Sequence, residues 1–146
     1  MKISSKVYKV QVMQGNFIPS RCNRFYGTSN QPKLGERIAD FACGTGGFLT
    51  SALKVLESQI QTLSDRTLFN NSVYGIEKKA LPHLLCITNL LLHDIDNPNV
   101  HHDNALEKSV KDYTENDKFD VILMNPPYGG SEIEQIKKNF PGFTEQ

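Results

Sequence analysis

The sequence of 146 residues has few cysteines, no long apolar run and no excess of either charge. Its three cysteines are odd in number and lack C-x-x-C spacing, which argues against a disulfide framework or a zinc site; they are Cys22, Cys43 and Cys86. No stretch approaches the roughly 18 apolar residues that a membrane span needs. The first residues, MKISSKVYKVQVMQGN, contain no apolar core of a signal peptide. These absences predict a soluble, cytoplasmic protein without a membrane partner.

Neither sign of charge dominates, because 16 lysines and arginines balance 16 aspartates and glutamates. A balanced chain offers little long-range attraction for the phosphates of nucleic acid. If nucleic acid is bound, we expect most phosphate contacts to come from elsewhere. The four histidines show no metal-ligand spacing, so no metal site is expected; they are His83, His93, His101 and His102.

From Glu36 onward, strand-like and helix-like segments alternate. RIADFA is typical of a short buried strand, and further strands are expected in SVYGIE (72–77), at 100–102 and in FDVILM (119–124). The continuous apolar run of FDVILM suggests burial on both faces. This order predicts an α/β fold with a doubly wound parallel sheet and right-handed crossovers. Residues 1–35 form an irregular segment, in which only VYKVQV alternates like a strand, and residues 36–146 form the main domain.

Two helices are expected between the first three strands. In FLTSALKVLESQI one apolar stripe contains Phe48, Leu49, Ala52, Leu53, Leu56 and Ile60. In KKALPHLLCITNLLLHD, Pro82 is tolerable near the helix start, and one face carries Leu81, Leu84, Leu85, Thr88 and Leu92. Such stripes are the faces by which helices usually pack on a sheet.

Each distinctive motif follows a predicted strand, at the edge where parallel sheets bind ligands. DFACGTGG places Asp40 in the first strand and glycines in the turn into the helix, where glycine permits positive φ and close approach of a ligand. The helix N-terminus beyond offers unpaired N–H groups. A tight turn without a ligand would use the same residue types. There is no GK[ST] and no G-x-G-x-x-G, which argues against a phosphate loop.

Glu77 closes the second predicted strand. A carboxylate at this place suits the two hydroxyls of a ribose, although a solvated strand end is the plain alternative. The glycine turn and Glu77 together predict a pocket for a nucleoside.

NPPYGG (125–130) ends the fourth strand, since proline cannot extend a ladder. Asn125 precedes a proline and is held extended. Its amide oxygen and the Pro126 carbonyl are two acceptors that suit an exocyclic amine. Tyr128 offers a flat face for stacking a base. The motif therefore predicts a rigid clamp for a planar amine, as against a strand stop with a surface tyrosine.

In this order, DFACGTGGFL, GIE and NPPYGG resemble the modification subunit of type I restriction–modification systems, a family of S-adenosylmethionine-dependent DNA adenine-N6 methyltransferases. NLLLHD is similar to the NL-x-LHG segment of that family. The chain departs from it at Phe41, where proline is usual, and GNFIPSR (15–21) resembles a GEFFTPR-type segment one residue short. The implied fold is the Rossmann-like sheet of S-adenosylmethionine methyltransferases, with only about its first four strands present.

The resemblance implies roles for individual residues. The cofactor would be held by Asp40, Ala42, Gly44, Gly46, Gly47, Glu77 and Asn104, with Glu77 at its ribose and Asn104 at its adenine. The flipped target adenine in double-stranded DNA would be held by Asn125, Pro126 and Tyr128. The implied partners are the specificity and restriction subunits of a type I system.

Four further expectations concern activity and association. The chain resembles a fragment of the family's catalytic domain, so a non-catalytic remnant that binds cofactor or a partner subunit is one alternative. A protein glutamine-N5 methyltransferase, which also uses NPPY, is another. We also expect no methyl transfer by the chain alone, and self-association through a free edge of FDVILM.

Overall fold

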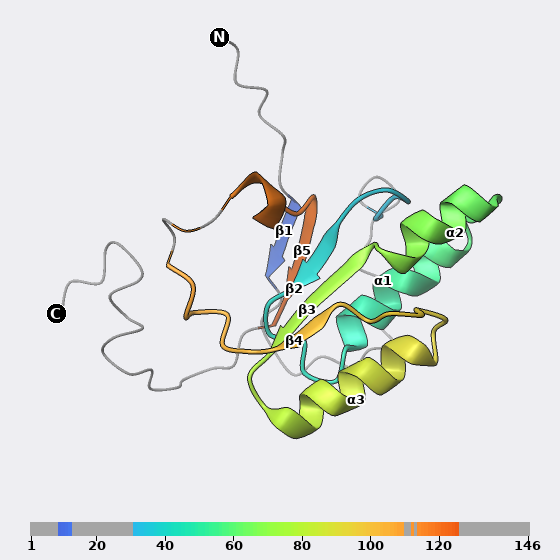
Figure 1. The fold of residues 1–146 in the computed structure, drawn as a ribbon. Coiled ribbons are helices and arrows are strands. Elements are labelled where there is room, and N and C mark those ends of the chain that lie inside the picture. Colours follow the sequence, from blue (N-terminus) through green and yellow to red (C-terminus); the bar gives the residue numbers. More distant parts are fainter. Residues whose placement is uncertain (1–8, 13–30, 110–111, 113, 126–146) are drawn as a thin grey trace, which may run out of the picture.

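The computed structural model describes residues 9–12, 31–109, 112 and 114–125 (Figure 1). One parallel sheet has the strand order β1-β5-β2-β3-β4. Its strands are β1 (Lys9–Val12), β2 (Ile38–Asp40), β3 (Val73–Glu77), β4 (Val100–His102) and β5 (Val121–Met124). Helices α1 (Gly47–Glu57) and α2 (Leu63–Asn70) connect β2 to β3, and α3 (Ala80–Leu91) connects β3 to β4. The predicted α/β fold with a parallel sheet is confirmed.

Strand β5 has a neighbour on each side, so the expectation of a free edge at FDVILM is wrong. It pairs with β2 through Ile38 and Val121, and with β1 from Lys9 opposite Val121 to Val12 opposite Met124. The segment VYKVQV thus supplies the strand that the sequence analysis considered missing. Its local alternation predicted a strand but carried no information about which neighbour it would pair with.

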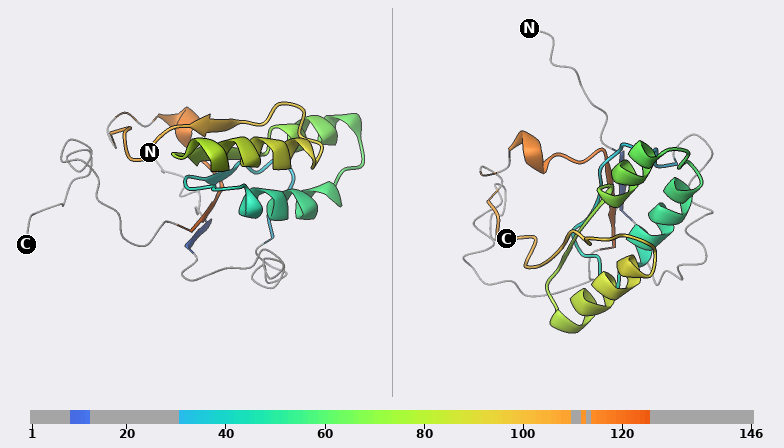
Figure 2. Two further views of the ribbon diagram at one scale, coloured as in Figure 1. Left: turned by 90° about the horizontal axis from the view of Figure 1, so that it is seen from below. Right: turned by 45° about the vertical axis from the view of Figure 1, so that its right-hand side comes forward.

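The helices cover one face of the sheet (Figure 2), and the buried core lies between them. The predicted stripe of α1 is confirmed, because Leu49, Ala52, Leu53 and Leu56 are buried. In β5, Val121 and Leu123 are buried while Ile122 and Met124 are only partly so. The second face of this strand is therefore less covered than its continuous apolar run suggested.

Helix α3 differs from the expectation in its orientation. It buries Cys86 and Leu90 against the core, whereas Leu81, Leu84, Leu85 and Leu92 of the predicted stripe are exposed. The leucine face is real, but it points towards solvent. None of the helices in the described residues is long and apolar enough to cross a membrane.

Helix α2 was not predicted. It starts with a capping box in which the Thr62 hydroxyl accepts the Asp65 N–H, and the Asp65 carboxylate accepts the Thr62 N–H. The sequence T-x-x-D is the signal that could have located it. Only Phe69 of this helix is buried, so the apolar periodicity used for the other helices is weak here.

Candidate functional site

The ends of β2 and β3 bring two acidic residues to the same edge of the sheet. Asp40 ends β2 opposite Gly75, and Glu77 ends β3 two residues further along. The Asp103 N–H donates to the Glu77 carbonyl, which brings the segment after β4 to the same edge. Three strand ends thus converge as a parallel sheet requires.

The glycine turn between β2 and α1 uses backbone conformations that favour glycine. Gly44 has φ 55° and Gly46 has φ 84°, both in the left-handed region. Gly46 is also the N-cap of α1, and no side chain caps the helix there. The first turn of α1 therefore presents N–H groups without a capping side chain, as predicted.

Glu77 holds the glycine turn from the neighbouring strand. Its Oε2 accepts the Gly44 N–H at 2.8 Å, and its Oε1 accepts the Lys79 N–H at 2.7 Å. Two charge-assisted bonds to backbone fix the orientation of the carboxylate. The structure thus brings together two elements that the sequence analysis had assigned to one pocket, and rules out a solvated strand end with no contacts.

Asp40 is fully buried beside this turn. Its Oδ1 accepts the Ala42 N–H at 3.0 Å, whereas Oδ2 is buried without a hydrogen-bond partner. Burial, with a smaller contribution from the Glu77 charge, raises the pKa of Asp40 to about 7, although the bond from Ala42 opposes the shift. A buried carboxylate with one unpaired oxygen is suited to a ligand that brings a donor or a positive charge.

Two residues of α3 support the turn from behind, and the sequence analysis had assigned no role to either. The Asn89 side chain donates to the Thr45 carbonyl at 2.7 Å. Cys86 lies under Gly46, where a Cβ would come within 2.7 Å of its Sγ. Both lie about 40 residues from the turn in sequence. The segment NLLLHD, noted for its family resemblance, begins at Asn89 and hinted at that residue alone.

Cys43 and Cys86 are buried free thiols that contact each other beneath the turn. A hydrogen bond with Cys86, burial, and the nearby carboxylates of Asp40 and Glu77 raise the pKa of Cys43. A thiol held protonated in this way is a packing residue, since the thiolate is the reactive form.

The second face of the sheet carries an aromatic cluster under the connection from β4 to β5. Phe41 packs edge-on against Tyr74 and Phe119, with ring centroids 6.3 and 5.8 Å apart. This cluster explains how the chain uses a phenylalanine where the similar family usually has proline. An open cavity of about 150 Å³ lies beside it, lined among others by Phe41, Ile76, Asn104 and Lys108.

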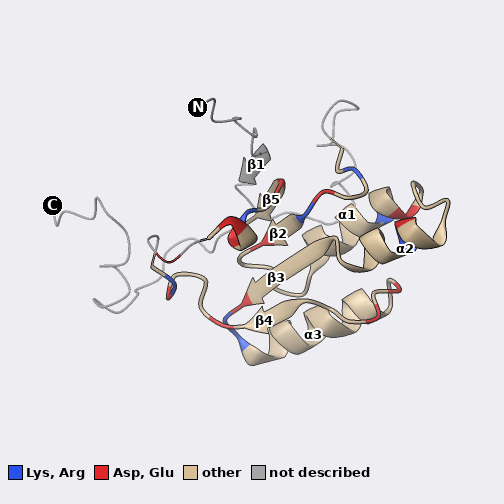
Figure 3. Cartoon of the chain, turned by 45° about the horizontal axis from the view of Figure 1, so that its top comes forward, with Lys and Arg blue, Asp and Glu red and all other residues tan. Residues whose placement is uncertain are grey.

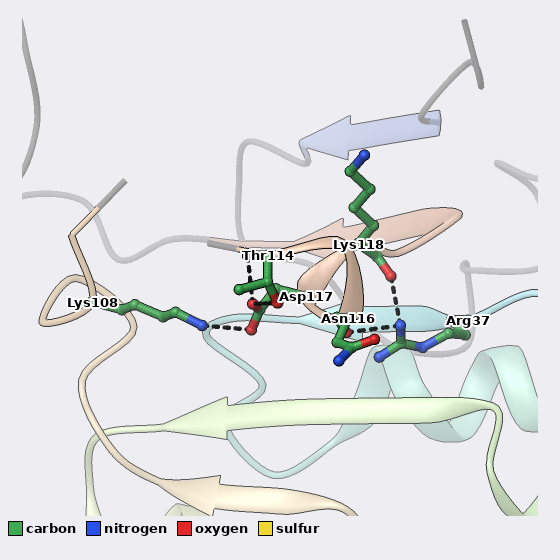
Figure 4. A network of polar contacts seen from close by, with 6 residues as sticks. All are labelled: Arg37, Lys108, Thr114, Asn116, Asp117 and Lys118. Carbon is green, nitrogen blue, oxygen red and sulfur yellow. Dashed lines mark hydrogen bonds and ion pairs between the residues drawn. The ribbon is translucent and has the colours of Figure 1, made fainter. Parts of the chain in front are cut away.

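Figure 4 shows the polar contacts that hold the far wall of this cavity. Arg37 Nη1 donates to the carbonyls of Asn116 and Lys118 at 2.9 Å, and its guanidinium lies 4.6 Å from the Phe119 ring centre. Lys108 pairs with Asp117 at 2.5 Å and holds the pKa of that carboxyl well below its usual range. Asn104 also lines the cavity. Its side-chain oxygen accepts the Leu106 N–H and so stabilises the local turn.

Asn125 directly follows β5, the strand beside β2. The pairing of β2 with β5 ends at Ala39 opposite Ile122, three residues before Asn125. Its side-chain oxygen is buried and has no hydrogen-bond partner among the described residues. Pro126 and Tyr128 lie outside the described residues, as do Cys22 and GNFIPSR. Within the described part of the chain, no group of three or more His, Cys, Asp or Glu side chains could hold a metal ion.

A parallel sheet with a glycine turn, an acidic residue on the next strand and an asparagine after β5 defines the class of Rossmann-like α/β proteins. The N-6 DNA Methylase family model matches residues 10–146, and the chain belongs to that family.

Relatives agree with this assignment. The chain is 47% identical over 127 residues to the type I restriction enzyme EcoEI methylase subunit of Escherichia coli, covering 86% of this chain and 26% of that protein. It is 31% identical over 111 residues to the MpnII methylase subunit of Mycoplasma pneumoniae, covering 71% of this chain and 19% of that protein. A solved type I modification subunit from Vibrio vulnificus YJ016 superposes with a TM-score of 0.76 at 43% identity, over 85% of this chain and 25% of that one. The chain thus spans between about a fifth and a quarter of the length of these relatives.

Proposed function

We propose that the chain carries the cofactor site and the amine-binding asparagine of a type I DNA adenine-N6 methyltransferase. The observation that carries the proposal is the bond from the Gly44 N–H to Glu77, which joins the glycine turn and the acidic strand end into one site beside Asp40. S-adenosylmethionine, when bound, supplies a methyl group on a positively charged sulfur. The residues present fit this cofactor, because Asp40 Oδ2 is a buried acceptor without a partner.

Each residue has a separate task in this proposal. Glu77, already oriented by two backbone N–H groups, would accept hydrogen bonds from the ribose hydroxyls. Ala42, Gly44, Gly46 and Gly47 would line the methionine part, where the absence of large side chains lets the backbone approach. Asn104 would meet the adenine end, since it lines the cavity beside Ile76, the residue before Glu77.

The substrate side of the proposal rests on Asn125. Its buried, unpartnered oxygen is an acceptor aimed at no group among the described residues, as a ligand-binding amide would be before substrate arrives. An adenine turned out of the duplex would donate its amine to Asn125 and to the Pro126 carbonyl, and would stack on Tyr128. These bonds hold the amine nitrogen with its lone pair available, so positioning supplies much of the rate. Because the chain has a net charge of zero and little attraction for phosphates, the proposal assigns most DNA contacts to partner subunits.

A remnant that binds cofactor without transferring a methyl group is the second candidate. It requires only the contacts that join Asp40, the glycine turn and Glu77, and it leaves Asn125 without a role. The glutamine-N5 alternative has lost support, because the family model matched is that of N-6 DNA methylases.

One experiment separates these functions. S-adenosylmethionine binding is measured by calorimetry for the wild type and for Asn125→Ala, and methyl transfer to unmodified duplex DNA is measured with and without a type I specificity subunit. We expect the two proteins to bind cofactor with affinities within a few-fold of each other. The wild type should transfer a methyl group only when the specificity subunit is present, and Asn125→Ala should transfer none in either condition. Binding without transfer in every condition would support the remnant, and no binding at all would reject both.

A further inference from the structure

Helix α3 has an apolar face that is exposed in the described part of the chain. The exposed leucines of α3 are Leu81 (67%), Leu84 (60%), Leu85 (44%) and Leu91 (50%), and its C-cap Leu92 is 75% exposed. Leu81, Leu84, Leu85, Thr88 and Leu92 follow helical spacing. The opposite face of the helix already packs Cys86 and Leu90 into the core. A contiguous exposed patch of this kind marks an interaction surface, unlike single exposed leucines.

The charges around this face have a specific arrangement. No Asp, Glu, Lys or Arg occurs from Ala80 to Leu92, whereas Lys78 and Lys79 precede the helix and Asp94 and Asp96 follow it. Figure 3 shows the helix without charge colour, with blue residues at its start, next to the red end of β3, and red residues after its other end. A second copy laid antiparallel would therefore place the lysines of each copy beside the aspartates of the other.

We propose that two copies of this chain associate through the leucine faces of α3, packed antiparallel about a two-fold axis. Leu81 of one copy then lies opposite Leu92 of the other, with Leu85 and Thr88 near the axis. The helix has 12 residues and is about 18 Å long, enough for three turns of interdigitated leucines. Because this face carries no charges, two copies of it can pack together without repulsion between like charges. The antiparallel helix dipoles add to the attraction between the lysines of one copy and the aspartates of the other.

Asp94 and Asp96, which follow α3, can still accept hydrogen bonds from the lysines of a second copy. Asp94 pairs with Arg66 at 3.9 Å but its side chain is 70% exposed, and Asp96 accepts one bond from Asn70. A carboxylate accepts several hydrogen bonds, so these internal contacts leave room for a lysine of a second copy.

Sedimentation velocity over roughly a hundredfold range of concentration tests the proposal, because dimerisation follows mass action. The wild type is expected to move from monomer to dimer, and Leu84→Glu and Leu92→Glu to raise the dissociation constant at least about tenfold. Leu63→Glu is the matched control: this leucine is 89% exposed on α2, and its replacement should leave association unchanged. Circular dichroism checks that each variant folds.

A charge exchange tests the antiparallel arrangement. Lys79→Glu and Asp96→Lys should each weaken the dimer, and the two changes in one chain should restore it. A wild type that stays monomeric, open-ended aggregation, association only with a different subunit, or a dimer that the leucine variants leave intact would overturn the proposal. Failure of the charge exchange to restore association would overturn the antiparallel geometry. None of these outcomes depends on methyl transfer.

Discussion

Asp40 couples the stability of the fold to pH. Its pKa is about 7 in the folded chain and 3.8 in an ordinary environment, so the folded state holds a proton that the unfolded state releases. Stability from this residue therefore falls as the pH rises through that window, and the penalty is complete above pH 7. At 1.36 kcal/mol for each pKa unit, the penalty is on the order of 4 kcal/mol.

The variant Asp40→Asn should remove this dependence. Urea unfolding of the variant and the wild type between pH 4 and 8 is expected to show the variant gaining relative stability as the pH rises. The constant cost of burying the new amide cancels when only the pH dependence is compared. Parallel pH profiles of the two proteins would show that the Asp40 carboxyl is not held protonated.

Glu77 holds the glycine turn and is the proposed ligand of the ribose, so its replacement should affect both the turn and cofactor binding. Glu77→Ala leaves the Gly44 and Lys79 N–H groups without their acceptor and is expected to weaken S-adenosylmethionine binding by about 1–3 kcal/mol. Glu77→Gln keeps one acceptor oxygen and should lose less. Calorimetric titration measures both, and an unchanged affinity in Glu77→Ala would remove the residue from the site.

At the residue scale, the sequence located the residues of the candidate site that lie within motifs. Asp40, the glycines and Glu77 could be found because strand ends and positive-φ turns leave local signals. Cys86 and Asn89 could not be assigned a role, since what they contact depends on how α3 packs against a turn about 40 residues earlier.

At the scale of elements, the packing of α3 against the glycine turn can be tested by a double-mutant cycle. Gly46→Ala should suffer both the strain of positive φ, about 1–2 kcal/mol, and the clash with Cys86. Gly44→Ala is the matched control, because it has positive φ but no atom within 4 Å of an added Cβ.

Cys86→Ala removes the clashing sulfur. In urea unfolding it should relieve part of the cost of Gly46→Ala, with a coupling energy of about 0.5–3 kcal/mol, and none of the cost of Gly44→Ala. Equal coupling in the two cycles would mean that α3 does not pack against the turn as described.

For α3, the sequence predicted the helix but not the face of the helix that packs against the core. The periodicity of α3 correctly gave a helix with a leucine stripe, yet that stripe is exposed and a thiol and one leucine form the core contact. Periodicity shows that residues share a face, but the choice between two apolar faces is made by the neighbouring elements. The same limit hid α2, whose start is marked by a capping box and whose apolar content is low.

At the scale of the whole molecule, sheet order was only partly predictable. The neighbours β2, β3 and β4 follow from short right-handed crossovers. The pairing of β1 with β5 joins residues more than 100 positions apart, and no local pattern specifies it. The expected open edge of β5 was wrong for that reason.

Strand β1 should therefore protect the molecule from edge-to-edge association. Deleting residues 1–12 removes the partner of β5 and exposes its backbone N–H and C=O groups along an apolar strand. Deleting residues 1–8 is the matched control, because it leaves Lys9–Val12 in place. We expect the longer deletion alone to lower the free energy of unfolding and to scatter light as aggregates. This association differs from the proposed α3 dimer, because Leu84→Glu should not suppress it. If both deletions unfold at the same urea concentration and remain equally monodisperse, β1 does not contribute to the stability of the sheet.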